Sequence, residues 1–120
     1  MDYTALRQMV RPEQLEQLHA NGKAWFQAKL LPPQMVPVVK ILSTTARCVW
    51  LVAAIHPNDR NRLLALCDVA DGDPHIRWMS LEAMARAAGP DATFVEDATF
   101  RAESALGDYA HTARREKRII

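Results

Sequence analysis

Residues 47–55 read RCVWLVAAI and decide the fold, because every residue after Arg47 is apolar. Successive side chains of an extended strand point to opposite faces. One face of this segment would carry Cys48, Trp50, Val52 and Ala54, and the other Val49, Leu51, Ala53 and Ile55. A strand that is apolar on both faces is typical of a position inside a sheet that is covered on each side. The segment therefore predicts a central strand.

Three more strands are predicted around this segment. One precedes it at residues 38–42, and two follow it at 63–69 and 75–79. The connections contain the turn-forming runs 43–45, 56–59 and 71–74. A parallel crossover needs a dozen or more residues, so these short connections favour an antiparallel meander of about four strands. A short edge strand is also predicted at 93–95.

Helices are predicted before and after the sheet. Asp2 suits the N-cap of a first helix, and Pro12 suits the first turn of a second. Asn21-Gly22 is expected to end that second helix, and residues 24–31 to form a third, which Pro32-Pro33 terminates. Ser80 is expected to cap a helix that Gly89-Pro90 stops, and residues 102–118 to form the last helix.

The predicted fold class is therefore α+β, with N-terminal and C-terminal helices packed against an antiparallel sheet. The 120 residues suit a single domain. Within it we expect a helical segment at 1–31, the sheet at 36–79, and a helix, the short edge strand and the C-terminal helix at 80–120.

A cytoplasmic protein is predicted, because the sequence shows neither a signal peptide nor an apolar run long enough to span a bilayer. Fifteen basic and 14 acidic residues leave a net charge of +1, which gives no global attraction for nucleic acid or anionic membranes. The N-terminus lacks a basic segment followed by an apolar core, so no secretory signal and no membrane partner are expected. Reduced thiols are expected at Cys48 and Cys67, with a disulfide between them as the alternative if their strands pair.

No catalytic, metal or cofactor site is predicted. None of the four histidines has a second histidine or a cysteine within five residues, so a zinc site from His56, Cys67 and His75 would have to be assembled by folding. The acidic run at 68–73 lacks the ligand spacing of a calcium loop. Glu96 and Asp97 are adjacent in an extended segment and would point to opposite faces. A small enzyme with a site of His56, His75 and Glu96 remains an alternative.

Two surfaces are candidates for binding partners. Trp25, Phe26, Arg77 and Trp78 are the predicted protein-binding residues, because large aromatic side chains are over-represented at contact hot spots. The basic run Arg114, Arg115, Lys117 and Arg118 is the alternative, a nucleic-acid-binding element that would contact phosphates. Cations in the last turn of a helix also complement the helix dipole, which would be a purely structural role.

The segment from Leu31 to Phe100 resembles an uncharacterised bacterial domain family. The matching pieces are Leu31-Pro32-Pro33, Val38-Val39-Lys40-Ile41, the Trp50 strand closing on Pro57, Leu64-Ala65-Leu66-Cys67-Asp68, Met79-Ser80-Leu81-Glu82, Gly89-Pro90 and Val95-Glu96-Asp97 with Phe100. The family is a domain of unknown function found mostly on plasmids and integrative conjugative elements. The resemblance implies a fold and a mobile-element setting, and no activity.

The leading hypothesis is a non-catalytic protein–protein interaction module. The mobile-element setting suggests that its partner is a host protein or complex, such as a CRISPR or restriction complex that the chain would inhibit. The second hypothesis is a nucleic-acid-binding accessory that uses the basic C-terminal helix. The chain is expected to be a monomer or a homodimer.

Overall fold

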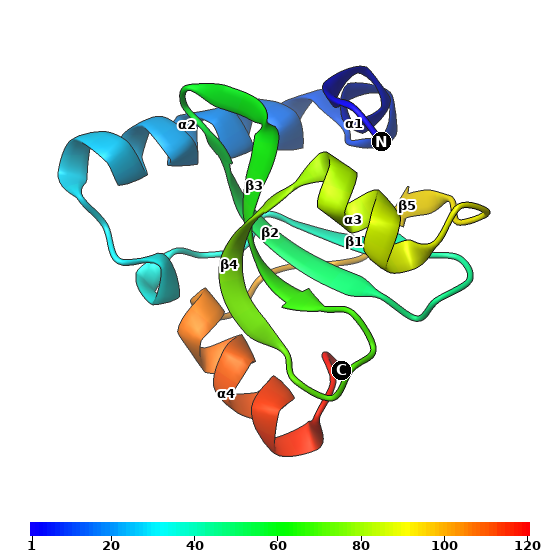
Figure 1. Cartoon of the computed structure of the whole chain (residues 1–120). Helices are drawn as coiled ribbons and strands as arrows, with labels where there is room; N and C mark the ends of the chain where they lie inside the picture. Colours follow the sequence, from blue (N-terminus) through cyan, green and yellow to red (C-terminus); the bar gives the residue numbers. More distant parts are fainter.

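Five antiparallel strands form one sheet in the order β4-β3-β2-β1-β5 (Figure 1). The computed structural model describes residues 1–120. The strands are β1 (Val39–Ser43), β2 (Val49–His56), β3 (Asp59–Asp68), β4 (His75–Ser80) and β5 (Phe94–Glu96). Strand β2 is central, and all its residues between Trp50 and Ile55 are buried, which confirms the prediction made from this segment.

The sheet differs from the predicted one at two places. It has five strands, because the short edge strand predicted at 93–95 forms one residue later, as β5, and pairs with β1 through Ile41 opposite Glu96. Strand β3 begins at Asp59, four residues before its predicted start at Leu63, because Pro57-Asn58 closes a tight turn and His56 pairs with Asp59. The first residues of β3 are polar and exposed, so the hydrophobic pattern did not show them.

The helices are α1 (Tyr3–Met9), α2 (Pro12–Ala28), α3 (Leu81–Ala88) and α4 (Leu106–Glu116), with a 3₁₀ turn η1 (Pro32–Gln34). The caps predicted for α1 and α3 are confirmed, because Asp2 accepts from the Ala5 N–H at 2.9 Å and Ser80 from the Ala83 N–H at 3.0 Å. The predicted stop at Asn21-Gly22 and the separate helix at 24–31 are wrong, since α2 runs through both. Helix α4 is shorter than the predicted 102–118 at both ends.

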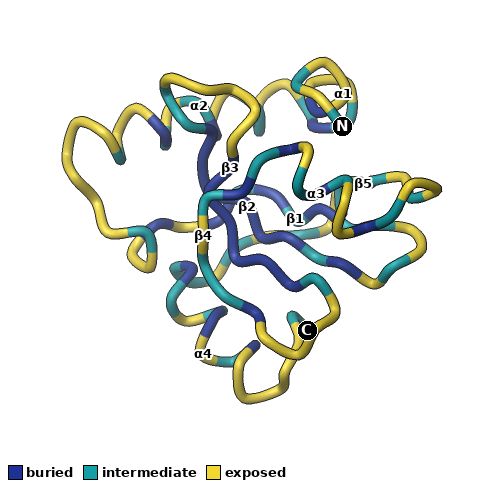
Figure 2. Tube along the Cα trace, in the orientation of Figure 1, coloured by how far each residue is buried: buried dark blue, intermediate teal, exposed yellow.

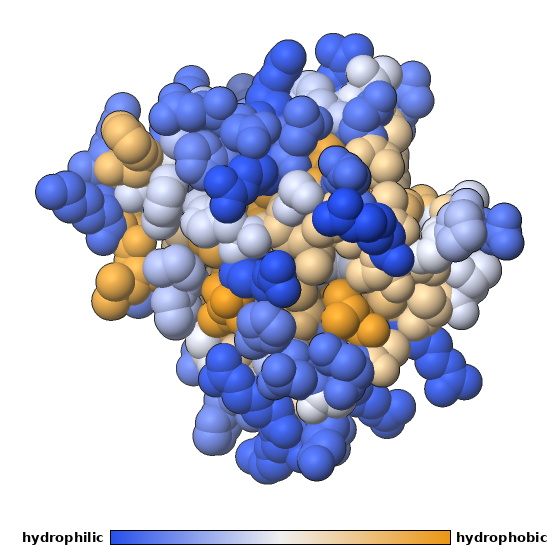
Figure 3. Space-filling view, viewed as in Figure 1, coloured by the Kyte–Doolittle hydropathy of each residue, from blue (hydrophilic) through white to orange (hydrophobic).

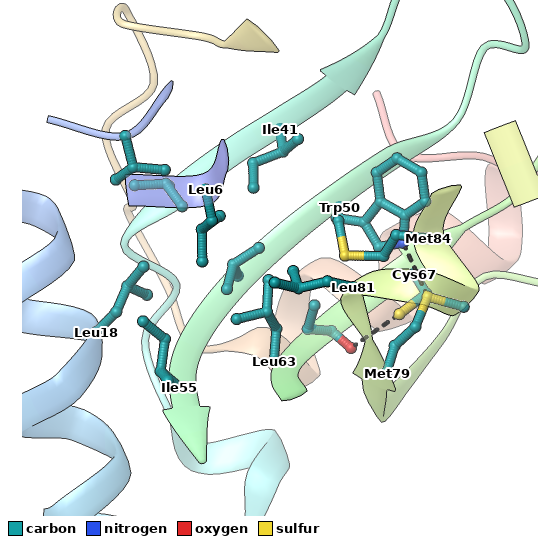
Figure 4. Packing of buried hydrophobic residues seen from close by; sticks show 14 of the residues in the cluster. Leu6, Leu18, Ile41, Trp50, Ile55, Leu63, Cys67, Met79, Leu81 and Met84 are labelled. Atoms are coloured by element: carbon teal, nitrogen blue, oxygen red, sulfur yellow. Dashed lines mark hydrogen bonds between the residues drawn. The ribbon is translucent and has the colours of Figure 1, made fainter. Parts of the chain in front are cut away.

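The two faces of the sheet carry separate cores, and Figure 2 shows the buried strands between the outer helices. One face, here called the α3 face, is covered by α1, the first half of α2, and α3. In Figure 4, Leu6 and Leu18 of the first two helices and Leu81 and Met84 of α3 pack against the strands. There the Trp50 indole N–H points to the Met79 sulfur at 3.2 Å. The other, the α4 face, packs against η1 and α4.

Helix α2 covers the edge of β2 beyond the end of β1. The pairing of β1 with β2 begins at Val39 opposite Val52, so the rest of β2 has no strand on that side. There the Asn21 amide donates to the Ala53 carbonyl at 2.8 Å, and a Cβ on Gly22 would lie 1.8 Å from the Ile55 carbonyl oxygen. Gly22 therefore allows the helix backbone to approach the strand backbone closely, and it does not end the helix. No helix combines the length and apolar character that crossing a bilayer requires.

Candidate partner-binding surface

Three aromatic rings from three elements meet at the end of the sheet where α2 passes. The Trp25 ring of α2 lies 4.8 Å from the Trp78 ring of β4, and the ring of His56, at the end of β2, lies 5.6 Å from Trp25 and 5.1 Å from Trp78, all as centroid distances. The phenyl ring of Phe26 lies 6.4 Å from Trp25. We call Trp25, Phe26, His56 and Trp78 the aromatic surface.

An exposed apolar segment continues from this surface. Of the large hydrophobic residues that are exposed, four lie between residues 26 and 36: Phe26 (60% exposed), Leu30 (37%), Leu31 (62%) and Val36 (52%). Figure 3 shows hydrophobic side chains gathered over the C-terminal end of α2 and the connection to η1, at the left of the view. Scattered apolar residues are ordinary on a protein surface, but a run beside clustered aromatic rings indicates a contact site.

The structure brings together three of the four predicted partner-binding residues and separates the fourth. Trp78 packs with the core of the α4 face. Arg77 precedes it in β4, so its exposed side chain points to the opposite face. Arg77 takes part in no ion pair. It therefore lies beside the aromatic surface across the thickness of the sheet, and not within it.

His56 is the member of the aromatic surface that sequence reasoning missed. Its Nδ1 accepts a hydrogen bond from the Asn58 N–H at 3.1 Å within the turn. The neutral ring therefore carries its proton on Nε2, where it is a donor. The turn-forming run at 56–59 did not indicate that β2 ends next to the Trp78 ring. The period-2 alternation of β2 also misleads here, because the register shift around Ala53 turns His56 to the α4 face.

The predicted nucleic-acid-binding residues divide between a helix surface and a groove. Arg114 and Arg115 are exposed on α4, while Lys117 and Arg118 line a groove of about 380 Å³ together with Arg47, which sequence reasoning did not include. Neither Arg47, Lys117 nor Arg118 forms an ion pair.

Asp68 also lines that groove. It is 3% exposed, and its two carboxylate oxygens accept the N–H groups of Ala70 at 3.0 Å and Ile119 at 2.9 Å. Asp68 thereby holds the C-terminal tail on the sheet, a role that its position in the predicted strand 63–69 did not indicate. Arg47, Ala70 and Lys117 line the same groove with positive φ angles of 54°, 64° and 62°.

The groups considered for metal binding and catalysis do not converge. No three His, Cys, Asp or Glu residues lie close enough to hold a metal ion. Cys67 pairs with His75 at one end of β3, whereas His56 lies at the other end of that strand, opposite Asp59. Glu96 sits on β5, at the far edge of the sheet from β4. The alternative enzyme site of His56, His75 and Glu96 is therefore not assembled.

Glu96 instead anchors the junction between α1 and α2. Its carboxylate accepts from the Arg11 backbone N–H and from Nε, both at 3.0 Å, and pairs with the terminal guanidinium nitrogen at 2.9 Å. The Glu96 side chain is 6% exposed. Adjacent Asp97 lies toward solvent and binds the Thr99 hydroxyl, a contact that lowers the pKa of the Asp97 carboxyl. The two acids have separate structural roles.

Both cysteines are free and buried, so the alternative of a Cys48–Cys67 disulfide is wrong. Burial raises the pKa of the Cys67 thiol to about 12, and it also raises that of Cys48. Thiols in this state are poor nucleophiles at neutral pH. His19, on α2, bonds to the Tyr3 hydroxyl at 2.7 Å, and burial lowers its pKa.

A known protein family matches nearly the whole chain. The chain belongs to the family described as protein of unknown function DUF2958, whose model matches residues 9–120. No curated protein and no solved structure matches the chain. The predicted resemblance to an uncharacterised domain family is thereby confirmed, while its bacterial, mobile-element setting stays a prediction. The matched region includes every residue of the aromatic surface.

Proposed function

We propose that this member of the DUF2958 family is a non-catalytic protein-binding module whose contact site is the aromatic surface with the adjoining segment of Phe26, Leu30, Leu31 and Val36. The observation that carries the proposal is the convergence of the Trp25, His56 and Trp78 rings beside the exposed Phe26 ring. These rings come from α2, β2 and β4, which the sheet holds in fixed positions.

Physical chemistry supports binding at this place. Aromatic rings give a large contact area and have few rotatable bonds, so little conformational entropy is lost when a partner covers them. Trp25 and Trp78 are partly buried against the α4-face core, and each is further restrained by its neighbouring rings. The centre of the surface is thus preorganised, and the exposed side chains of Phe26 and Leu31 are left to enter the partner.

We further propose, from the predicted mobile-element setting, that the partner is a host defence complex, which the chain would inhibit by occupying one of its surfaces. This finer role is part of the proposal. It depends on the identity of the partner, so the first experiment is designed to capture that partner at a defined residue.

Photo-crosslinking from position 26 tests the contact site. We expect a Phe26→p-benzoyl-phenylalanine variant, expressed as the full chain in its own host, to form one dominant covalent adduct on irradiation. Phe26 is 60% exposed, so the larger ring is accommodated. The matched control is the same replacement at Val95, which is 45% exposed on β5 at the opposite edge of the sheet. No adduct at position 26, or equal adducts at both positions, would contradict the proposal.

The basic groove supports a second candidate function, nucleic-acid binding. Arg47 comes from the connection between β1 and β2, and Lys117 and Arg118 from the end of α4. They line one groove and form no ion pair, and the Asp68 carboxylate in the same lining accepts backbone N–H groups. Three cations contacting three phosphates would make the affinity for DNA fall about 40-fold between 50 and 200 mM salt.

Fluorescence anisotropy with labelled single-stranded and duplex DNA checks this candidate. If the groove binds phosphates, Arg47→Glu and Arg118→Glu should each weaken binding about tenfold, whereas Lys23→Glu, at an exposed position of α2, should leave it unchanged. Affinity that does not depend on salt, or an equal loss in all three variants, would exclude the groove as a nucleic-acid site.

A further inference from the structure

One edge of the sheet is open along β4. The strand pairs with β3 on one side and has no neighbouring strand on the other. The backbone hydrogen bonds outside the helices and strands do not involve Ile76 or Trp78, and no side chain bonds to their backbone groups. An open edge of this kind is a template on which another extended segment can pair.

The backbone hydrogen bonds of the sheet identify which residues of β4 face outward. The Ser43 N–H donates to the Cys48 carbonyl at 3.0 Å, so these two residues form a hydrogen-bonded pair between β1 and β2. Bonded pairs alternate along an antiparallel ladder, and a residue turns both of its backbone groups to the same side. Neighbouring residues of a strand turn their backbone groups to opposite sides, so the alternation can be followed from β1 through β2 and β3 to β4. With the strand registers, this makes Ala65 and Arg77 a bonded pair between β3 and β4. Ile76 and Trp78 therefore direct their N–H and C=O groups away from the sheet.

Side chains of two kinds border this edge. Ile76 and Trp78 lie on the α4 face, where the Trp78 ring belongs to the aromatic surface. Arg77 lies between them on the α3 face, exposed and without an ion-pair partner. Within an added strand, the residue opposite Arg77 would project to the same face as its guanidinium, and the residues on either side would project toward Ile76 and Trp78.

We propose that β4 accepts an extended segment of the partner protein as a sixth strand, antiparallel to β4 like every other pair in this sheet, and that this segment carries an acidic residue between two apolar ones. The acidic side chain pairs with Arg77, and the apolar side chains contact Ile76 and the aromatic surface. This inference rests on the proposed function and specifies the partner's chemistry. Backbone hydrogen bonds supply binding in such strand addition, and alternate side chains supply specificity.

A second copy of this chain is disfavoured as the occupant in the register that joins Ile76 and Trp78 alone. A symmetric antiparallel β4–β4 pair centred on Arg77 places Ile76 opposite Trp78 of the other copy, so that the outward groups of both residues are used. That arrangement sets Arg77 directly opposite Arg77, and like charges at directly opposed positions are destabilising. An acidic residue at that position is attracted instead.

Selection of peptides on the full-length protein tests the proposal. A library of random eight-residue peptides, displayed on phage, is expected to yield sequences with an acidic residue between two apolar ones. We expect Arg77→Glu to weaken the selected peptides about tenfold, while Arg7→Glu, an exposed charge reversal on α1, changes binding less than twofold. Selection of no peptide, or of peptides without this pattern, would overturn the proposal.

N-methylated peptides test the backbone pairing without altering the protein. Methylation at either apolar position should weaken binding about tenfold or more, because those amides face β4, whereas methylation at the acidic position should have little effect. The Ile76 and Trp78 amides should also become slower to exchange with solvent when peptide is bound. Equal effects at all three positions would exclude strand addition. If the edge fails these tests while position 26 still crosslinks to a partner, the protein-binding function stands and only strand addition is excluded.

Discussion

Gly22→Ala is expected to lower the free energy of unfolding by about 3 kcal/mol or more. The added Cβ would lie 1.8 Å from the Ile55 carbonyl oxygen, and the obstacle is backbone on both sides, so no side-chain rotation relieves the clash. Helix α2 must move away from β2, which also lengthens the hydrogen bond from Asn21 to the Ala53 carbonyl. Urea denaturation followed by circular dichroism measures the change.

Helix propensity alone predicts the opposite sign for this substitution. Alanine is better than glycine inside a helix by about 1 kcal/mol. Lys23→Ala, at the exposed neighbouring position, is the matched control and should change stability by less than about 0.5 kcal/mol. A Gly22→Ala protein as stable as the wild type would show that α2 does not rest on the edge of β2 as described.

Glu96→Ala should destabilise the protein by about 2 kcal/mol. The substitution leaves the Arg11 guanidinium without its partner and the Arg11 backbone N–H without an acceptor. Because this contact joins the start of α2 to β5, the α1–α2 junction should also show faster amide exchange. Denaturation by urea at low and moderate salt is the appropriate measurement.

The exposed pair of Glu82 and Arg86 on α3 provides the control. Its side chains are 80% and 70% exposed, so Glu82→Ala should cost only about 0.5 kcal/mol. Equal losses from Glu96→Ala and Glu82→Ala would mean that burial adds nothing to the Arg11 contact. A loss of a biochemical activity in Glu96→Ala without any change in stability would point instead to a chemical role for the acid.

The sequence predicted those helices and strands whose hydrophobic pattern or capping residue matches their position in the fold. The apolar run at 48–55 predicted a central strand, and the caps at Asp2 and Ser80 predicted helix starts, because each signal depends on neighbouring residues alone. Gly22 misled because a glycine that permits close packing looks the same in sequence as a glycine that ends a helix. The start of β3 was missed because its first four residues are polar and exposed, so they do not continue the apolar pattern of the strand.

The candidate site was predicted in part for a similar reason. Trp25, Phe26 and Trp78 were identified by residue type, which is visible in sequence. Their meeting with His56 depends on where β2 and β4 end and on the register shift near Ala53, which no local pattern encodes. Arg77 was grouped with Trp78 by adjacency, yet strand alternation separates their side chains. Arg47 joins Lys117 across the fold, so the groove was not visible either.

The central claim is that the chain contacts another protein through the surface around Phe26. The most direct measurement uses the partner that crosslinking recovers. Its affinity is measured by calorimetry or interferometry for the wild-type, Phe26→Ser and Val95→Ser proteins. Both substitutions shorten an exposed apolar side chain, so neither is expected to affect folding. We predict that Phe26→Ser weakens binding about tenfold or more and that Val95→Ser leaves it unchanged. Equal affinity of all three proteins, or equal loss in both variants, would contradict the account.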